Sequence, residues 1–252
     1  MSTSASSLVS PRITAAVTRR VLIQLRRDRR TLAMLVVLPC VIMTLLWWMF
    51  TDRPGPGFSA LAPALLALIP FIVMFLVTSV TTLRERTSGT LERLLAMPMG
   101  KGDFLLGYAI AFGVVAAVQS ALAVAVSTWF LDLDVAGPVW VLMVVAVADA
   151  VLGSALGLFV SAFARTEFQA VQFMPALVIP QILLCGLFVH REDLPGFLHA
   201  VSDVLPLSYA VDAMNAVTAS TDPAVLGDLA VIAGFALAAL VLGALTLRRR
   251  TA

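Results

Sequence analysis

The segment Val139–Phe163 reads VWVLMVVAVADAVLGSALGLFVSAF, and it decides the fold class. Its 25 residues contain one charged side chain, Asp149, and no proline. An α-helix rises about 1.5 Å per residue, so roughly 20 apolar residues cross a hydrocarbon core about 30 Å thick. We predict a membrane-spanning helix, because in lipid the spanning backbone must satisfy its own hydrogen bonds.

The whole chain shares this composition: 60% of its 252 residues are hydrophobic, 13% are charged, and the mean hydropathy is +0.99. A soluble domain is nearer 45–50% apolar and about a quarter charged. A water-soluble domain, a disordered chain and a disulfide scaffold are therefore excluded, and the two cysteines offer no metal spacing. We predict an all-α polytopic membrane protein with six transmembrane helices, at Ala33–Phe50, Leu61–Thr82, Leu105–Leu131, Val139–Phe163, Ala170–Val189 and Leu229–Leu247.

Basic residues orient these helices. Fifteen of the 17 lie in the leader (1–32), the connection 84–103, the turn at Arg165 and the C-terminal arginines. Only Arg53 and Arg191 fall on the other side, where acidic residues gather. The positive-inside rule then predicts a multi-pass protein, within the domain 33–252, whose two termini are both cytoplasmic.

The leader contains an amphipathic pattern within Pro11–Arg30. Ile13, Val17, Val21 and Leu25 are four residues apart, which places them on one helical face with arginines around the rest. This predicts an interfacial helix held in the headgroup layer by anionic lipid. The alternative is a solvated basic leader that only enforces topology.

Two connections are more informative than the spans. Residues 84–103, RERTSGTLERLLAMPMGKGD, predict a short amphipathic helix at Thr90–Met97 that Pro98 ends. Such a helix can dock in a partner's groove, or it can be a connector that contacts nothing. In the outer segment 190–228, Leu194–Leu205 and Leu207–Val217 are each too short to span, which predicts a re-entrant helical hairpin.

Both connections carry family-like motifs. The stretch ERTSGTLERLL at 85–95 is followed by Pro98, and a second stretch runs from FART at 163–166 through Leu194-Pro195 to PLSY at 206–209. Together they resemble the membrane subunit of bacterial ABC exporters, of the daunorubicin-resistance and nodulation-factor export permease type. Tyr108 departs from the pattern, since many relatives have a basic residue there, and so does His190 near the outer end of span five.

The resemblance implies the permease half of an ATP-driven exporter in the bacterial plasma membrane. Its pathway would carry a hydrophobic or amphipathic compound: a drug, an antibiotic, a lipid or a glycolipid. Two copies of a separate ATP-binding ABC subunit would hold the ATP and Mg, and a second permease subunit, identical or different, would complete the pathway. The implied coupling residues are Glu85, Arg86, Gly89, Thr90, Leu91, Glu92, Leu94, Leu95, Pro98 and Arg165, and the implied outer hairpin includes Leu194, Pro195, Pro206 and Tyr209.

Motifs for other chemistry are absent from the sequence. Gly100-Lys101 is followed by Gly102, and Leu95 stands where a phosphate-binding loop needs glycine. No HExxH, GxSxG or metal-ligand cluster occurs, and the basic residues do not form a groove with aromatic residues as nucleic-acid binding requires. We therefore expect a transport subunit rather than an enzyme, with no cofactor of its own and no nucleic-acid partner.

Polar residues inside the spans are candidates for the pathway or for a subunit seam: Gln119, Asp149, Gln172 and Gln181. A charge at mid-bilayer costs roughly 2.5–3.5 kcal/mol on insertion scales, so Asp149 should face protein or water. One expectation bonds it to Ser154 or Gln119; another makes it the key group of a proton-driven secondary transporter. Gly153 and Gly157 predict close helix approach, and Arg165 is expected either to pair with Glu167 or to contact the ATPase.

Overall fold

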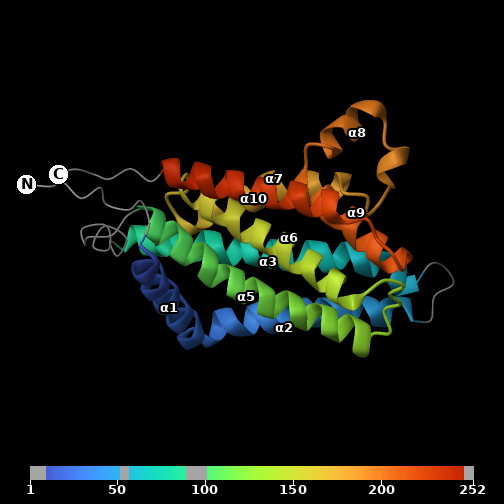
Figure 1. Ribbon diagram of the computed structural model, residues 1–252, viewed down its shortest axis with the longest axis horizontal. Coiled ribbons are helices and arrows are strands. Elements are labelled where there is room, and N and C mark those ends of the chain that lie inside the picture. Colours follow the sequence, from blue (N-terminus) through green and yellow to red (C-terminus); the bar gives the residue numbers. More distant parts are fainter. Residues whose placement is uncertain (1–9, 52–56, 89–100, 247–252) are drawn as a thin grey trace, which may run out of the picture.

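The computed structural model describes residues 10–51, 57–88 and 101–246, and in this part of the chain all regular structure is helical (Figure 1). Six of its helices are long and apolar enough to cross a membrane: α2, α3, α5, α6, α7 and α10. The predicted all-α fold with six spans is therefore confirmed. The elements in chain order are α1 (Pro11–Arg27), α2 (Arg29–Phe50), α3 (Gly57–Thr87), α5 (Lys101–Trp129), α6 (Val139–Ser161), α7 (Glu167–Leu184), η1 (Arg191–Asp193), α8 (Gly196–Ser202), α9 (Pro206–Ala219) and α10 (Leu226–Thr246).

Helices α3 and α6 form the centre of the bundle, and they are the most buried of the six spans. A Cβ atom at Gly153 would lie 2.5 Å from the carbonyl oxygen of Phe71, and one at Gly157 would lie 2.5 Å from that of Phe75. The predicted close approach at this glycine pair is confirmed, because only hydrogen side chains fit between the two backbones. Helices α2, α7 and α10 pack outside this centre and bury few of their residues.

Two span boundaries differ from the sequence prediction for identifiable reasons. Helix α3 continues past the predicted end at Thr82 to Thr87, because Leu83 and Glu85 are buried against neighbouring elements. Helix α7 ends at Leu184, before the predicted Val189, and Gly186 turns the chain with a φ of +93°. This left-handed backbone conformation is readily open to glycine and ends the helix.

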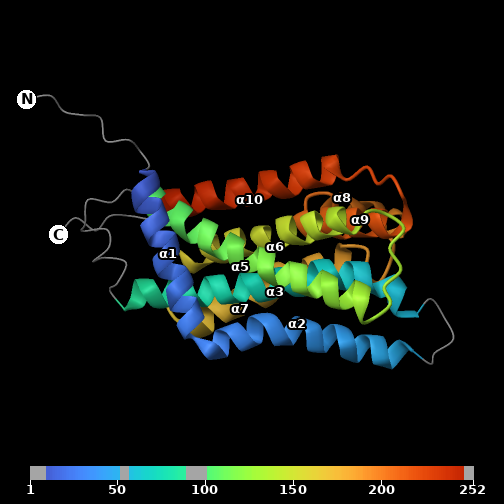
Figure 2. The same cartoon turned by 60° about the horizontal axis from the view of Figure 1, so that its bottom comes forward.

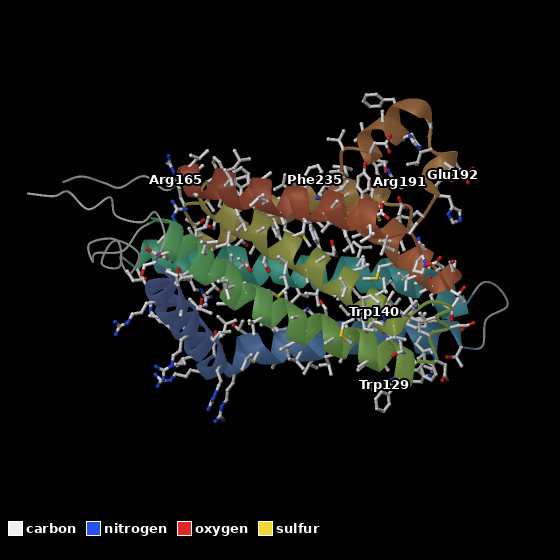
Figure 3. All side chains as sticks on the ribbon, in the orientation of Figure 1. Trp129, Trp140, Arg165, Arg191, Glu192 and Phe235 are labelled. Atoms are coloured by element: carbon white, nitrogen blue, oxygen red, sulfur yellow. The ribbon has the colours of Figure 1, made fainter. Side chains whose placement is uncertain are left out.

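The two ends of the bundle carry different elements. Helix α1 lies across one end, where α10 finishes, and α8 and α9 lie towards the other (Figures 1 and 2). Trp129 and Trp140 are exposed and lie towards the α8 end, whereas Arg165 lies at the α1 end (Figure 3). Exposed tryptophans near a helix end are typical of a membrane–water boundary.

Asp28 makes the sharp corner between α1 and α2. Its backbone N–H donates to Gln24 O and Leu25 O at the end of α1. Its carboxylate accepts from Thr31 N (3.1 Å) and Thr31 Oγ1 (2.7 Å) at the start of α2. The same residue therefore ends one helix and caps the next, and it couples the direction of α1 to that of the first span.

Candidate functional site

Helix α1 packs on the bundle through one face, formed by Thr14, Val17, Val21 and Leu25. Three of these four residues belong to the apolar face predicted from the spacing, and Thr14 takes the place of Ile13, which is half-buried. The prediction placed this face in the headgroup layer, whereas it is buried against other helices of the chain. The helix crosses α5 at Gly107, where a Cβ would lie 2.6 Å from Val17 Cγ1. The amphipathic arrangement of α1 follows from this packing.

An ion pair attaches α1 to the last turns of α3. Nη2 of Arg20 donates to Glu85 Oε2 at 3.0 Å and to Oε1 at 3.2 Å. The Glu85 side chain is only 5% exposed, while that of Arg20 is 35% exposed. Tyr108 is buried beside both side chains, and its hydroxyl interacts with the Glu85 carboxylate and the Arg20 guanidinium although, among the described residues, it meets the geometry of a hydrogen bond with neither. A charged pair thus occupies the point where α1, α3 and α5 meet.

A second attachment joins α1 to the start of α5. Asp103, 2% exposed, accepts hydrogen bonds from the backbone N–H of Ser10 and from Thr14 Oγ1 at 3.1 Å. Thr18 Oγ1 also donates to the carbonyl oxygen of Gly107 at 3.1 Å. Because Glu85 precedes residues 89–100 and Asp103 follows them, α1 is bonded to both helices that border this segment.

The predicted coupling residues divide into two groups. Gly89, Thr90, Leu91, Glu92, Leu94, Leu95 and Pro98 lie outside the described residues, as does the predicted helix Thr90–Met97. The three that are described are Glu85, Arg86 and Arg165. Glu85 is engaged by α1, and Arg86 donates to the carbonyl oxygen of Ser161 at the end of α6. Of these three, only Arg165 has an exposed side chain.

The expected pairing of Arg165 with Glu167 is wrong. Nε of Arg84, near the end of α3, donates to Oε1 of Glu167, at the start of α7, at 2.7 Å. The Glu167 carboxylate therefore joins α3 to α7. The backbone N–H of Arg165 donates instead to Gln169 Oε1 at 2.8 Å. The turn between α6 and α7 is therefore held by Gln169, and the side chain of Arg165 is exposed at the α1 end of the bundle (Figure 3).

Arg191 organises the outer segment, a role that its sequence position did not indicate. It donates to Ser202 Oγ (2.8 Å), to Asp203 Oδ1 (2.6 Å) and to Asp212, and its guanidinium lies 5.2 Å from the ring centroid of Tyr209. Burial raises the pKa of Asp212, although the charge of Arg191 acts in the opposite direction. Four polar or aromatic groups from this segment therefore converge on one guanidinium.

The first outer helix is shorter than the predicted Leu194–Leu205, and the second extends beyond both ends of the predicted Leu207–Val217. Helix α8 covers Gly196–Ser202, because Pro195 precedes its first residue, and α9 begins at the buried Pro206. Leu194 is half-buried and Pro195 is exposed. Tyr209 donates its hydroxyl to the carbonyl oxygen of Asp203 at 2.7 Å. Helix α9 packs against α3, α6 and α10, and this contact returns the outer segment to the bundle.

The four pathway candidates lie in different environments. Gln119 and Asp149 are 2% and 0% exposed, and neither side chain has a hydrogen-bond partner among the residues that the structure describes. The expected bonds from Asp149 to Gln119 or Ser154 are therefore wrong; Ser154 Oγ donates to the carbonyl oxygen of Ala150, one turn earlier. Gln181 is 5% exposed, donates to Leu177 O and accepts from the N–H of Leu207. Only Gln172 is exposed.

Comparisons with known proteins agree with this architecture. The probable multidrug ABC transporter permease YbhR of Escherichia coli (strain K12) is 29% identical over 150 residues, which are 60% of this chain and 41% of that protein. The linearmycin resistance permease protein LnrN of Bacillus subtilis (strain 168) is 25% identical over 173 residues, 67% of this chain and 44% of LnrN. ABC transporter G family member 20 of Dictyostelium discoideum is 26% identical over 155 residues, 62% of this chain and 21% of that protein.

The chain thus matches about two fifths of the length of its bacterial relatives. The family described as ABC-2 type transporter matches residues 13–218, from the amphipathic helix α1 to the end of α9. This match includes the ion pair between α1 and α3, the glycine contact of α6 and the outer segment held by Arg191. The chain is a multi-pass membrane protein that belongs to the ABC-2 type transporter family.

Proposed function

We propose that this chain is the permease half of an ATP-driven exporter of a hydrophobic or amphipathic compound. The match of the ABC-2 type transporter family over residues 13–218 is the observation that carries this proposal. Two bacterial relatives are named as a probable multidrug permease and a linearmycin resistance permease, which favours a lipophilic or amphipathic substrate. ATP and Mg would bind to two copies of a separate ATP-binding subunit.

The ATP-binding subunit is proposed to dock on residues 85–98 and to contact Arg165. Support comes from the neighbouring helices: Glu85 begins this segment, Asp103 follows it, and α1 is bonded to both of them. A force applied between these two positions would therefore reach α1 as well as α3 and α5. We propose that this end of the bundle, with its excess of arginines, faces the cytoplasm.

The pathway is proposed to run along α7, against a second permease subunit. Gln172 is exposed on this span, and a polar side chain at that position needs water or a protein partner because lipid cannot hydrogen-bond it. Gln119, Asp149 and Gln181 are enclosed within the single chain, so we assign them to its internal packing. The second subunit would be an identical or a different permease.

Co-expression with an ATP-binding subunit from the source organism tests the proposal. The double substitution Leu94→Ser and Leu95→Ser removes the apolar side of the docking segment, and we expect it to abolish co-purification and permease-stimulated ATPase activity. Leu245→Ser is the matched control, because Leu245 is 73% exposed near the end of α10 and should bind no ATPase. Failure of the native chain to retain any ATP-binding subunit, or equal retention by both variants, would refute the proposal.

A further inference from the structure

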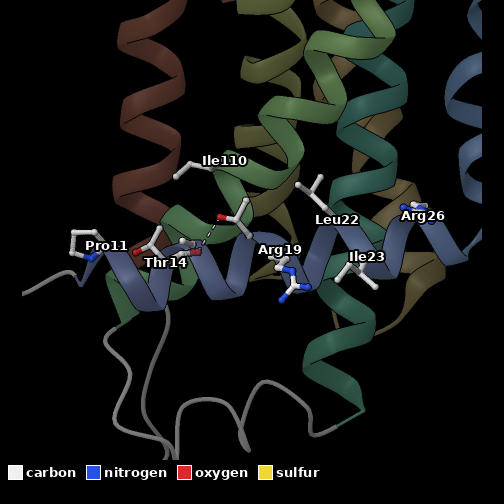
Figure 4. Close-up of a pocket in the computed structure, with 9 residues that line it drawn as sticks. Pro11, Thr14, Arg19, Leu22, Ile23, Arg26 and Ile110 are labelled. Atoms are coloured by element: carbon white, nitrogen blue, oxygen red, sulfur yellow. Dashed lines mark hydrogen bonds between the residues drawn. The ribbon is translucent and has the colours of Figure 1, made fainter.

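A groove of about 670 Å³ runs along the outer side of α1 (Figure 4). Helix α1 supplies most of its lining, including Arg19, Leu22, Ile23 and Arg26, and α5 supplies Ile110. The groove lies on the side of α1 that the packing against the bundle leaves open. It therefore adjoins α5, a membrane-spanning helix.

The cationic part of the groove consists of Arg19 and Arg26. These residues are seven apart, so after almost two full helical turns they point to the same side of α1. Both side chains are exposed, and neither takes part in an ion pair among the described residues, whereas Arg20 on the adjacent face is paired with Glu85. Two unpaired guanidinium groups on one side of a helix favour an anion with several acceptor oxygens, such as a phosphodiester.

The apolar part of the groove lies beside these arginines. Ile23 is 41% exposed and Ile110 is 48% exposed, and Leu22 lies beside Ile23 on α1, on the side that faces the bundle helices (Figure 4). Ile110 is three residues along α5 from Gly107, where α1 crosses. The groove thus continues from the arginines onto the side of a spanning helix. A free phosphate would leave this apolar surface uncovered, whereas an acyl chain would cover it.

We propose that this groove binds one anionic phospholipid, with its phosphate between Arg19 and Arg26 and the upper part of an acyl chain against Ile110. We choose a phospholipid because its negative charge complements the two arginines and because the groove lies beside a membrane-spanning helix. A helix that lies across the ends of several spans meets the headgroup layer, where anionic lipids are concentrated. The inference rests on membership of a multi-pass membrane family and is independent of the transported compound and of the ATPase.

Native mass spectrometry of the purified 252-residue chain tests this site. Dioleoyl phosphatidylglycerol is titrated into the detergent-solubilised protein, with dioleoyl phosphatidylcholine as the neutral probe. Each cation near an anionic lipid surface contributes roughly a fivefold change in affinity, so R19Q/R26Q should weaken the first phosphatidylglycerol about 25-fold. The matched control is R12Q/R27Q, which removes two exposed arginines of the same helix outside the groove and should change this affinity less than about threefold.

Two further measurements distinguish a bound lipid from other possible occupants of the groove. Ile110→Asn should weaken phosphatidylglycerol, and inorganic phosphate should not displace it, because the tail contributes to binding. Equal losses in the two double variants, equal binding of both lipids, or displacement by inorganic phosphate would overturn the proposal. It would also be overturned if the assembled transporter carried no lipid there because a protein segment filled the groove.

Discussion

Substituting the two members of the Arg20–Glu85 pair should give unequal losses of stability. Glu85 is 5% exposed, so Arg20→Gln leaves a buried carboxylate without its donor, and this should cost about 3–5 kcal/mol. The Arg20 side chain is 35% exposed but its Nη1 is buried, so Glu85→Gln leaves a guanidinium that water reaches only in part, and this should cost about 1.5–3 kcal/mol. The double variant should lose less than the sum of the two single losses, by about 0.5–3 kcal/mol.

Equilibrium unfolding in mixed detergent micelles, followed by the fluorescence of the four tryptophans, measures these free energies. Tyr108→Phe is the control, because the hydroxyl lies near both members of the pair but, among the described residues, meets the geometry of a hydrogen bond with neither, so its removal should cost about 0.5–1.5 kcal/mol, less than Arg20→Gln. If Glu85→Gln destabilises the protein as much as Arg20→Gln, or if the two losses simply add, the ion pair does not attach α1 to α3 as argued.

The other predictions use the same unfolding assay. Gly153→Ala should cost about 1–3 kcal/mol, because its Cβ would lie 2.5 Å from Phe71 O, whereas Gly234→Ala, with nothing within 4 Å, should gain about 0.5–1 kcal/mol; equal effects would contradict the packing of α6 on α3. Asp149→Asn should change stability by less than about 1 kcal/mol, because the carboxyl has no hydrogen-bond partner to lose; a larger loss would reveal a partner. Arg84→Gln should cost only about 0.2–1 kcal/mol, because both members of its pair are more than half exposed, and a cost as large as that of Arg20→Gln would contradict the link between burial and pair strength.

The spans could be predicted from the sequence because their signal is local. Val139–Phe163 is apolar around its whole circumference, and twenty such residues can satisfy their backbone only as a helix in lipid. The glycine contact was predictable for the same reason, since Gly153 and Gly157 lie one turn apart. The exact end of α3 was not, because the burial of Leu83 and Glu85 depends on α1 and α7, which lie far away in the sequence.

The candidate site was less accessible to sequence reasoning because its bonds are long-range. Arg20 and Glu85 are 65 residues apart, and nothing in the leader distinguishes Arg20 from its neighbouring arginines except its position between Val17 and Val21 at the edge of the buried face. Arg191 was equally hidden: its partners lie 11 to 21 residues later, and their convergence depends on how α8 and α9 fold back. Counting charges along the sequence predicted the side of the membrane on which each arginine lies. It could not predict which side chain each arginine binds.

The different strengths of these attachments suggest how α1 would respond to a displacement of residues 89–100. Detaching Glu85 from Arg20 would leave a carboxylate of 5% exposure unpaired, at a cost of about 3–5 kcal/mol. Moving α1 together with the ends of α3 and α5 keeps this pair intact, and it also keeps the two hydrogen bonds to Asp103. Moving α1 together with α3 and α5 therefore costs less free energy than detaching Glu85 from Arg20. Because Asp28 ends α1 and caps α2, the same movement would tilt the first span, which packs loosely enough on the outside of the bundle to follow.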